Sequence, residues 1–116
     1  MDLIYFKEGE FDNFKKMDKD FLCLLDKARH IAQTPFKITS DYRSKKKNKA
    51  VGGSPDSAHL YGYAIDLACS NSIARSAIIR AALSVGINRI GVASNFIHLD
   101  IADRYITKPA NVIWTY

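Results

Sequence analysis

The sequence contains little cysteine, little proline and no long apolar run. Cys23 and Cys69 are the only cysteines among 116 residues. They are too few for a disulfide framework, and we expect both to be buried, reduced packing residues. No apolar run approaches the roughly 18 residues of a transmembrane helix, so we expect no membrane span. No signal peptide is visible at the N-terminus, so we expect a protein that is made in the cytoplasm and released by other means.

Composition and charge suit one ordinary globular domain. Hydrophobic residues make up 47% and charged residues 25% of the chain, close to the globular average. We expect a monomer with a single domain over residues 1–116, which can bury a core without disulfide bonds. The formal net charge of +5 favours anionic partners, such as nucleic acid, anionic lipid or a bacterial wall with acidic polymers. Charge alone does not choose among them.

The apolar spacing predicts two helices and several short strands. Asp18 is the expected N-cap of a first helix, and a second helix begins near Asn71 or Ser72 and stops at Gly86. The lysine-rich residues 44–56 read as a mobile basic loop. Strands are expected over residues 3–7, 36–40, 62–68, 89–93, 96–102 and 112–116. This order predicts an α+β fold, in which a small antiparallel sheet packs helices on one face and keeps the other open for a site.

Apolar and polar side chains alternate along residues 96–101. Ile97, Leu99 and Ile101 share one face of the expected strand. His98 and Asp100 share the other face. Because the apolar face belongs against the core, His98 and Asp100 are expected to stand side by side on the open face.

A second patterned segment, the expected strand over residues 62–68, carries the carboxylate of Asp66 on the face opposite Ile65 and Leu67. If its strand neighbours residues 96–102, Asp66 and His98 converge on one point, and a bend at Gly62 lets His59 reach it. A lone histidine in a strand is more often a hydrogen-bonded structural residue, so the prediction depends on the coincidence of both segments. Two imidazoles and one carboxylate are a ligand set for a catalytic zinc with an open position for water. The residues by themselves thus allow one Zn²⁺ ion at His59, Asp66 and His98, beside the structural roles that each residue could have alone.

Two motifs resemble those of a known family. The pattern Ser57-x-His59-x-x-Gly62-x-Ala64-x-Asp66, followed by His98-x-Asp100, resembles the signature of the D-alanyl-D-alanine carboxypeptidase family of zinc peptidases. That family includes murein endopeptidases and phage endolysins, and the hedgehog signalling domain is similar in fold and metal ligands. The upstream run Ile38–Ser44 resembles the family's Thr-Ser-Gly-Tyr-Arg segment, with Asp41 where glycine is usual. The resemblance extends loosely from about Phe6 to Asp100.

The resemblance implies hydrolysis of peptide bonds in bacterial peptidoglycan, near D-amino acids, by a carboxypeptidase or an endopeptidase. It makes His59, Asp66 and His98 the zinc ligands. It also implies that Arg43 holds a substrate carboxylate or the developing oxyanion, a task suited to a guanidinium group. Ser57 would line the site and contact substrate or a ligand. The enzyme would then act on the cell wall, and a phage lysin released by other proteins fits the absence of a visible leader.

One position departs from the family pattern. Several members have Asp or Glu three residues before the last histidine, where it acts as general base, and this chain has Asn95. Asp100 is the nearest other carboxylate. It is either the base or the partner that orients a ligand histidine, and the sequence leaves both roles open.

Two other functions remain as alternatives. The first is a non-catalytic zinc module of the hedgehog type that only binds a partner, which Asn95 keeps open. The second is a small nucleic-acid-binding domain, motivated by the basic run from Arg43 to Lys49. The aromatic residues show no base-stacking pattern, so we expect a peptidoglycan peptide as the partner and no nucleic acid.

Overall fold

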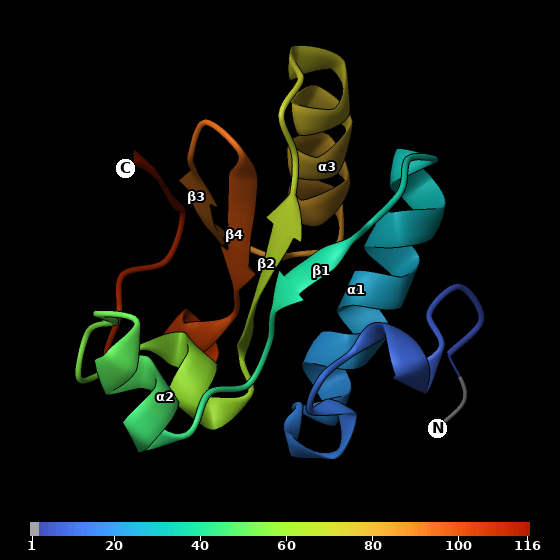
Figure 1. The fold of residues 1–116 in the computed structure, drawn as a ribbon. Coiled ribbons are helices and arrows are strands. Elements are labelled where there is room, and N and C mark those ends of the chain that lie inside the picture. The colour runs from blue at the N-terminus through green and yellow to red at the C-terminus, as the bar shows by residue number, and fades with distance from the viewer. Residues whose placement is uncertain (1–2) are drawn as a thin grey trace.

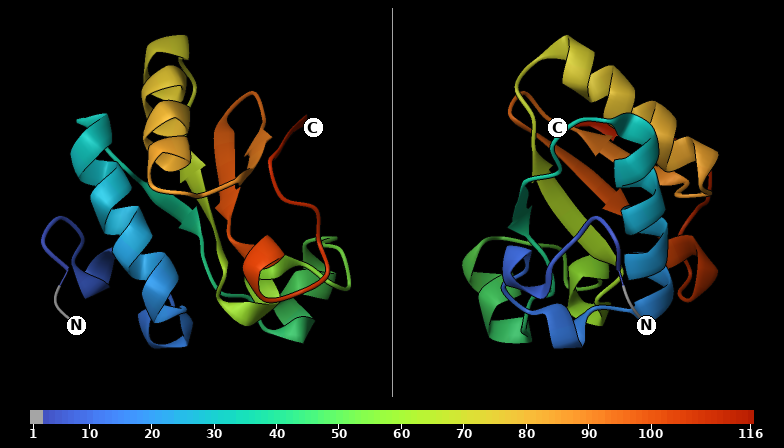
Figure 2. Two further views of the ribbon diagram at one scale, coloured as in Figure 1. Left: turned by 180° about the vertical axis from the view of Figure 1, so that it is seen from behind. Right: turned by 90° about the vertical axis from the view of Figure 1, so that its right-hand side faces the viewer.

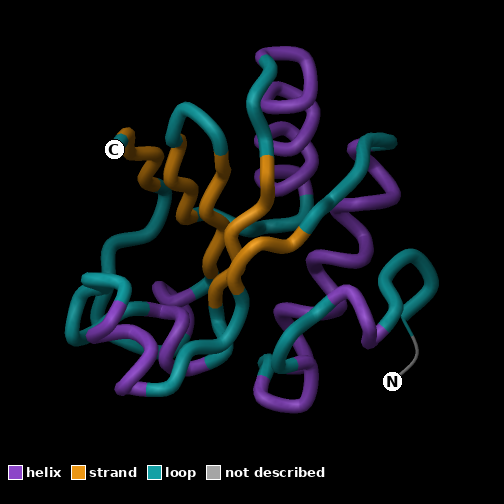
Figure 3. Tube along the Cα trace, viewed as in Figure 1, coloured by secondary structure: helices purple, strands orange, loops and turns teal. Residues whose placement is uncertain are grey.

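The fold combines three α-helices with one five-stranded sheet among residues 3–116, which the computed structural model describes (Figure 1). In chain order the elements are α1 (Lys19–Ala32), β1 (Ile38–Ser40), α2 (Lys45–Ala50), β2 (Ala64–Ala68), α3 (Ser72–Ser84), β3 (Arg89–Val92), β4 (Phe96–Asp100) and β5 (Val112–Thr115). The strand order across the sheet is β1-β2-β4-β3-β5 (Figure 3). The predicted α+β class is therefore confirmed.

Helices α1 and α3 form as predicted and cover one face of the sheet (Figure 2). The Asp18 carboxylate accepts a hydrogen bond from the backbone N–H of Phe21, and the Asn71 side chain accepts one from Ala74. The two helices and the inward side of the sheet share one core, whose fully buried members include Phe21, Leu25, Ile65, Leu67, Ile78, Ile90, Ile97 and Leu99. Within residues 3–116, no helix has both the length and the apolar character that crossing a bilayer requires.

The last strand departs from the predicted antiparallel sheet. The pairs β1–β2, β2–β4 and β3–β4 are antiparallel, but β5 runs parallel to β3. The end of β4 lies beside the start of β3, because Asp100 pairs with Arg89. The chain returns to the sheet at that same end, where Val112 pairs with Arg89, and it therefore enters β5 in the direction of β3. The sheet is mixed, and β5 widens its open face by one strand.

The N-terminal segment that was predicted as a strand, residues 3–7, does not join the sheet. The backbone N–H groups of Ile4, Tyr5 and Phe6 all donate to the Asp26 carboxylate at 2.9 Å. Phe6 is buried in the core. The segment satisfies its backbone donors on a side chain of α1 rather than on a neighbouring strand, so the strand prediction is wrong there.

Part of the predicted basic loop over residues 44–56 is the helix α2. The Ser44 hydroxyl oxygen accepts a hydrogen bond from the Lys47 N–H at 3.1 Å, and this N-cap is the signal that the loop prediction overlooked. Asn48 is buried, donates to the Ser54 carbonyl at 2.8 Å and accepts from Arg43. Asn48 thus fastens a lysine-rich helix beside the open face of the sheet.

We expect the substitution Gly62→Ala to destabilise the fold. Gly62 has a φ of +73°, and a Cβ atom there would lie 2.3 Å from the carbonyl oxygen of Lys16. The left-handed conformation costs a non-glycine residue about 1–2 kcal/mol, and the backbone clash adds to that cost. The midpoint of urea unfolding should fall by more than the conformational cost alone explains.

Gly52→Ala is the matched control, because Gly52 has a φ of +74° but open space around its Cβ position. This variant should lose only the conformational part of the unfolding free energy. Equal losses in the Gly62 and Gly52 variants would contradict a role for the close approach to Lys16.

Candidate metal centre

Three side chains from distant parts of the chain meet on the open face of the sheet. One ligand atom from each of His59, Asp66 and His98 lies within 4.8 Å of the others, and all three residues are buried. Asp66 on β2 and His98 on β4 are direct cross-strand partners. His59 comes from the 3-10 helix Ala58–Tyr61, which leads into β2. The strand neighbourhood on which the sequence prediction depended is therefore present.

The ring of His59 is held from behind by a backbone carbonyl. Its Nδ1 lies 2.7 Å from the carbonyl oxygen of Asp41, which can only accept, so Nδ1 carries the proton. Its Nε2 faces the candidate metal position and lies 3.4 Å from Oδ1 of Asp66. The Arg43 N–H also donates to the His59 carbonyl at 2.9 Å. These two bonds tie the segment after β1 to the helix that carries His59.

The ring of His98 is held from behind by a carboxylate. Its Nε2 lies 2.6 Å from Oδ2 of Asp100, and its Nδ1 lies 3.0 Å from Oδ1 of Asp66. The other oxygen of Asp100 accepts from Arg89 Nε at 2.7 Å and from the Ala102 N–H at 2.9 Å. Asp100 is only 1% exposed, so both of its oxygens are engaged inside the protein.

Hydrogen bonds outweigh burial in setting the charges of this cluster. Burial opposes ionisation of Asp66, but hydrogen bonds with His59 and His98 prevail and hold the pKa of its carboxyl group far below the usual range. Burial also opposes the charged form of His98, but its bonds with Asp100 and Asp66 prevail and raise its pKa. The pKa of Asp100 is lowered against burial, chiefly by His98. The centre thus holds two carboxylates in the anionic form that a cation requires.

The donor set fits a metal ion of the zinc type. Each histidine has one ring nitrogen anchored on an oxygen acceptor and the other directed at Asp66, which is how proteins orient ligand histidines. Two imidazole nitrogens and one carboxylate oxygen suit Zn²⁺, whereas Mg²⁺ and Ca²⁺ prefer oxygen ligands alone. Three protein ligands leave a position for water or substrate. His59, Asp66 and His98 can therefore bind a metal ion.

The three side chains line a pocket of about 320 Å³. Arg43 points into it, with Nη2 3.4 Å from Oδ2 of Asp66 and Nε donating to the Ser40 hydroxyl at 3.2 Å. The rest of the wall is partly cationic and partly aromatic, with Arg89, Lys108, Phe96, Trp114 and Tyr116. The pocket therefore offers different surfaces to anionic and apolar groups.

The pocket contains every side chain that the sequence singled out for the site: Arg43, Ser57, His59, Asp66, His98 and Asp100. The Ser57 hydroxyl accepts the N–H of His59 at 3.3 Å and so caps the 3-10 helix. Asn95 is exposed in the turn between β3 and β4 and does not line the pocket. The roles of these residues as ligands or catalytic groups stay predictions.

Sequence reasoning missed several residues that shape the centre, among them Arg89, Trp114 and Asp41. Trp114, the only tryptophan in the sequence, falls two residues after Val112 and two before Tyr116, and this period of two is a signal that could have found it. Asp41 acts through its backbone carbonyl, which no side-chain pattern reveals. Its carboxylate serves elsewhere and accepts from the backbone and side chain of Asn13.

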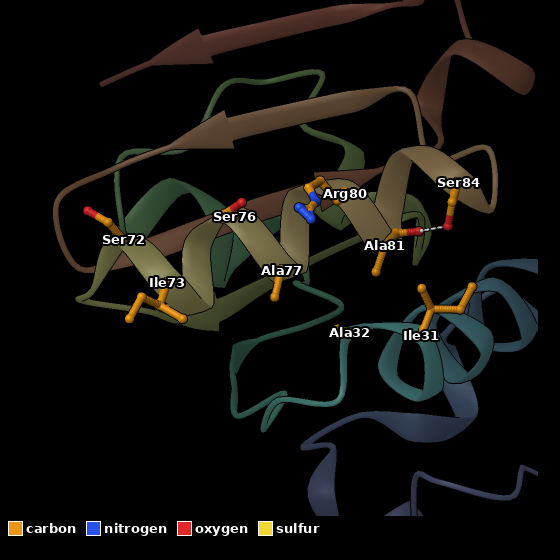
Figure 4. A pocket seen from close by; sticks show the side chains of 9 residues that line it. All are labelled: Ile31, Ala32, Ser72, Ile73, Ser76, Ala77, Arg80, Ala81 and Ser84. Carbon is orange, nitrogen blue, oxygen red and sulfur yellow. Dashed lines mark hydrogen bonds between the residues drawn. The ribbon is translucent and has the colours of Figure 1, made fainter.

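A larger groove of about 780 Å³ lies between α1 and α3, away from the centre (Figure 4). Small, aliphatic and hydroxyl side chains line it together with one charged group, Arg80. This lining includes no histidine, cysteine or carboxylate. The groove therefore lacks ligands for a metal ion, and the smaller pocket on the sheet is the candidate site.

Comparison with known families agrees with this chemistry. A family model described as Peptidase M15 matches residues 6–100, a span that contains His59, Asp66 and His98. Peptidases of that family are zinc-dependent. No curated protein matches the chain. Because the match spans most of the sequence, the chain belongs to the Peptidase M15 family.

Proposed function

We propose that this protein hydrolyses peptide bonds in the stem peptides of bacterial peptidoglycan, next to D-amino acids, with one zinc ion held by His59, Asp66 and His98. The observation that carries the proposal is the convergence of these three buried side chains within 4.8 Å in an open pocket. Membership of a peptidase family supports the reaction. The net charge of +5 favours encounter with an anionic cell wall.

Arg43 is the residue that we expect to bind the anionic part of the substrate. Zn²⁺ bound at the centre supplies a Lewis acid that acidifies water and polarises carbonyl oxygens. The Arg43 guanidinium group lies on the Asp66 side of the pocket, where Ser40 and Asn48 orient it through its Nε and Nη1. A guanidinium group fixed in this way can accept a substrate carboxylate or stabilise the oxyanion of the transition state.

Asp100 fits the role of a positioning residue better than that of a general base. One oxygen accepts from His98, and the other accepts from Arg89 and Ala102. A carboxylate with both oxygens engaged in this way orients His98 and stabilises its Nε2–H tautomer. The geometry thus favours the second of the two roles that the sequence left open.

The direct test is digestion of purified peptidoglycan by the zinc-loaded protein. We expect release of stem-peptide fragments, identified by mass spectrometry of the soluble products, and loss of this release when a chelator removes the metal. Adding Zn²⁺ back should restore it. Metal analysis of the same sample should give one zinc per chain, and intact walls in the presence of bound zinc would contradict the proposed function.

We expect Arg43→Ala to lower kcat/KM by about a hundredfold or more, because an oriented donor to a developing oxyanion contributes on that scale. Arg43→Lys should recover only part of the loss, since an ammonium group lacks the planar fork of donors. Initial rates on soluble muropeptides and the zinc content of each variant measure the effect. The zinc content should stay at one per chain, because Arg43 is not a ligand in this proposal.

Lys47→Ala is the control for the Arg43 variants. Lys47 is an exposed residue of the neighbouring helix α2, and its replacement removes the same net charge. Its rates should stay near those of the wild type. A comparable loss in the Lys47 variant would mean that Arg43 acts only through the overall field of the protein.

One observation favours a second candidate, a non-catalytic zinc-binding interaction module of the hedgehog type. Within residues 3–116, the carboxylates that line the pocket are Asp66 and Asp100, and both are engaged with neighbouring side chains. The pocket therefore lacks an uncommitted carboxylate to act as general base. Stoichiometric zinc binding without cleavage of any wall type would favour this module over the peptidase.

A further inference from the structure

We propose that the Trp114 indole forms the side of the pocket that contacts substrate, here called the Trp114 wall. In this proposal the indole packs against a small aliphatic side chain of the substrate, beside the scissile bond. This assignment rests on the proposed function. It concerns β5, which follows the end of the family match at residue 100. The wall would therefore set the substrate preference of this chain through a segment outside the matched region.

The pairing register places Trp114 in one row with the candidate ligands. Asp66 pairs with His98, His98 pairs with Gly91, and Gly91 pairs with Trp114. Residues paired across neighbouring strands point to the same face of a sheet. One residue from each of four strands thus lies on the pocket face, and one of these four has no side chain.

The missing side chain in this row is what admits the indole. A Cβ atom on Gly91 would lie 2.7 Å from Nε1 and 2.8 Å from Cε2 of Trp114. The ring therefore extends over β3 toward the ligands, and its centroid lies 5.4 Å from that of His98. Any larger residue than glycine at position 91 would push the indole away from the centre.

A second contact holds the indole in place. The guanidinium carbon of Arg89 lies 5.1 Å from the centroid of the Trp114 ring, within the range of a cation–π interaction. Arg89 is in turn bonded to Asp100, which orients His98. The network that orients a candidate ligand thus also fixes the wall, so the wall is preorganised before substrate arrives.

The two sides of the pocket differ in chemistry. Trp114, Phe96 and Tyr116 make one side aromatic, while Arg43 lies beside Asp66 on another. Trp114 is only half-buried, so part of its ring remains open to the pocket. This combination suits a peptide with a small aliphatic side chain against the indole and a carboxylate at Arg43. Alanyl residues beside acidic groups in a stem peptide have that chemistry.

The kinetic test compares Trp114→Ala, Gly91→Ala and Ile113→Ala on the soluble muropeptides that the wild type cleaves. Ile113 is the matched control, because it lies next to Trp114 on β5 and is 56% exposed. We expect Trp114→Ala to raise KM about tenfold or more with a much smaller change in kcat, the signature of lost substrate binding. Gly91→Ala should raise KM in the same way, because its Cβ displaces the indole even though the indole is still present. Ile113→Ala should have the KM and kcat of the wild type. Zinc content should be unchanged in all three.

Fluorescence gives a readout that does not depend on turnover. Trp114 is the only tryptophan, so intrinsic emission reports this ring alone. Stopped-flow mixing of the zinc-loaded chain with a synthetic stem pentapeptide ending in D-Ala–D-Ala should change the emission saturably within the binding phase. The Ile113 variant should show the same emission change at the same peptide concentrations as the wild type. The Gly91 variant should need about tenfold more peptide to reach half of the maximal emission change.

The outcomes separate the wall from the proposed function. If the protein cleaves peptidoglycan, the Trp114 variant keeps the wild-type KM and no emission change is seen, the Trp114 assignment is overturned and the peptidase function stands. An emission change without cleavage of any peptidoglycan would support Trp114 as part of a peptide-binding surface and contradict the peptidase function. Neither cleavage nor an emission change would overturn both.

Discussion

Replacing His59 by alanine is expected to abolish zinc binding and hydrolysis together. The variant removes one of three ligands, and the Nε2 atom lost is the one that faces Asp66 at 3.4 Å. A catalytic metal contributes several kcal/mol of transition-state stabilisation, and each ~1.4 kcal/mol is a factor of about ten in rate. We therefore expect kcat/KM to fall by about a thousandfold or more. Metal analysis after dialysis and rates on muropeptides measure the two losses.

His30→Ala is the matched control for this experiment. His30 is the remaining histidine, lies exposed near the end of α1 and stacks on Tyr5 with ring centroids 4.7 Å apart. Its replacement should leave zinc content and rate unchanged. Full zinc content and activity in the His59 variant, with circular dichroism showing an intact fold, would refute the proposed centre.

The second large effect is expected for Asp100→Ala. The substitution leaves Arg89, which is 9% exposed, without its carboxylate partner and removes the acceptor of the His98 Nε2–H. Breaking one side of a buried ion pair typically costs about 3–5 kcal/mol of unfolding free energy. Loss of a partner that orients a ligand histidine typically weakens metal binding about 10- to 100-fold. Urea unfolding and zinc titration with a competing chelator measure the two losses.

Two further variants show whether the unpaired, buried Arg89 cation causes the stability loss of Asp100→Ala. Asp100→Ala combined with Arg89→Leu should be more stable than Asp100→Ala alone, because the second change removes the unpaired cation. Asp56→Ala removes an exposed carboxylate from its pair with the half-buried Lys108 and should have little effect on stability. Stability losses of similar size for Asp56 and Asp100 would contradict this explanation. A general-base role would predict lost activity with unchanged zinc affinity.

Short-range patterns in the sequence were enough to predict the faces of the central strands. The alternation of Ile97 and Leu99 with His98 and Asp100 decides which side chains enter the core, because successive residues of a strand point to opposite faces. Cap residues such as Asp18 likewise located the start of α1. Alternation therefore pointed to Asp66 and His98, whereas His59 was named from the bend at Gly62 and from the family resemblance.

The tertiary structure alone decided which partners these side chains meet. That Asp100 is committed to Arg89, that the Asp41 carbonyl orients His59, and that the Trp114 ring crosses Gly91 all depend on contacts between distant segments. The parallel direction of β5 was missed for the same reason. Alternation and capping depend on neighbours within a few residues, so they can be read locally. The partners across a sheet follow from how the whole chain packs, and a local pattern does not contain that information.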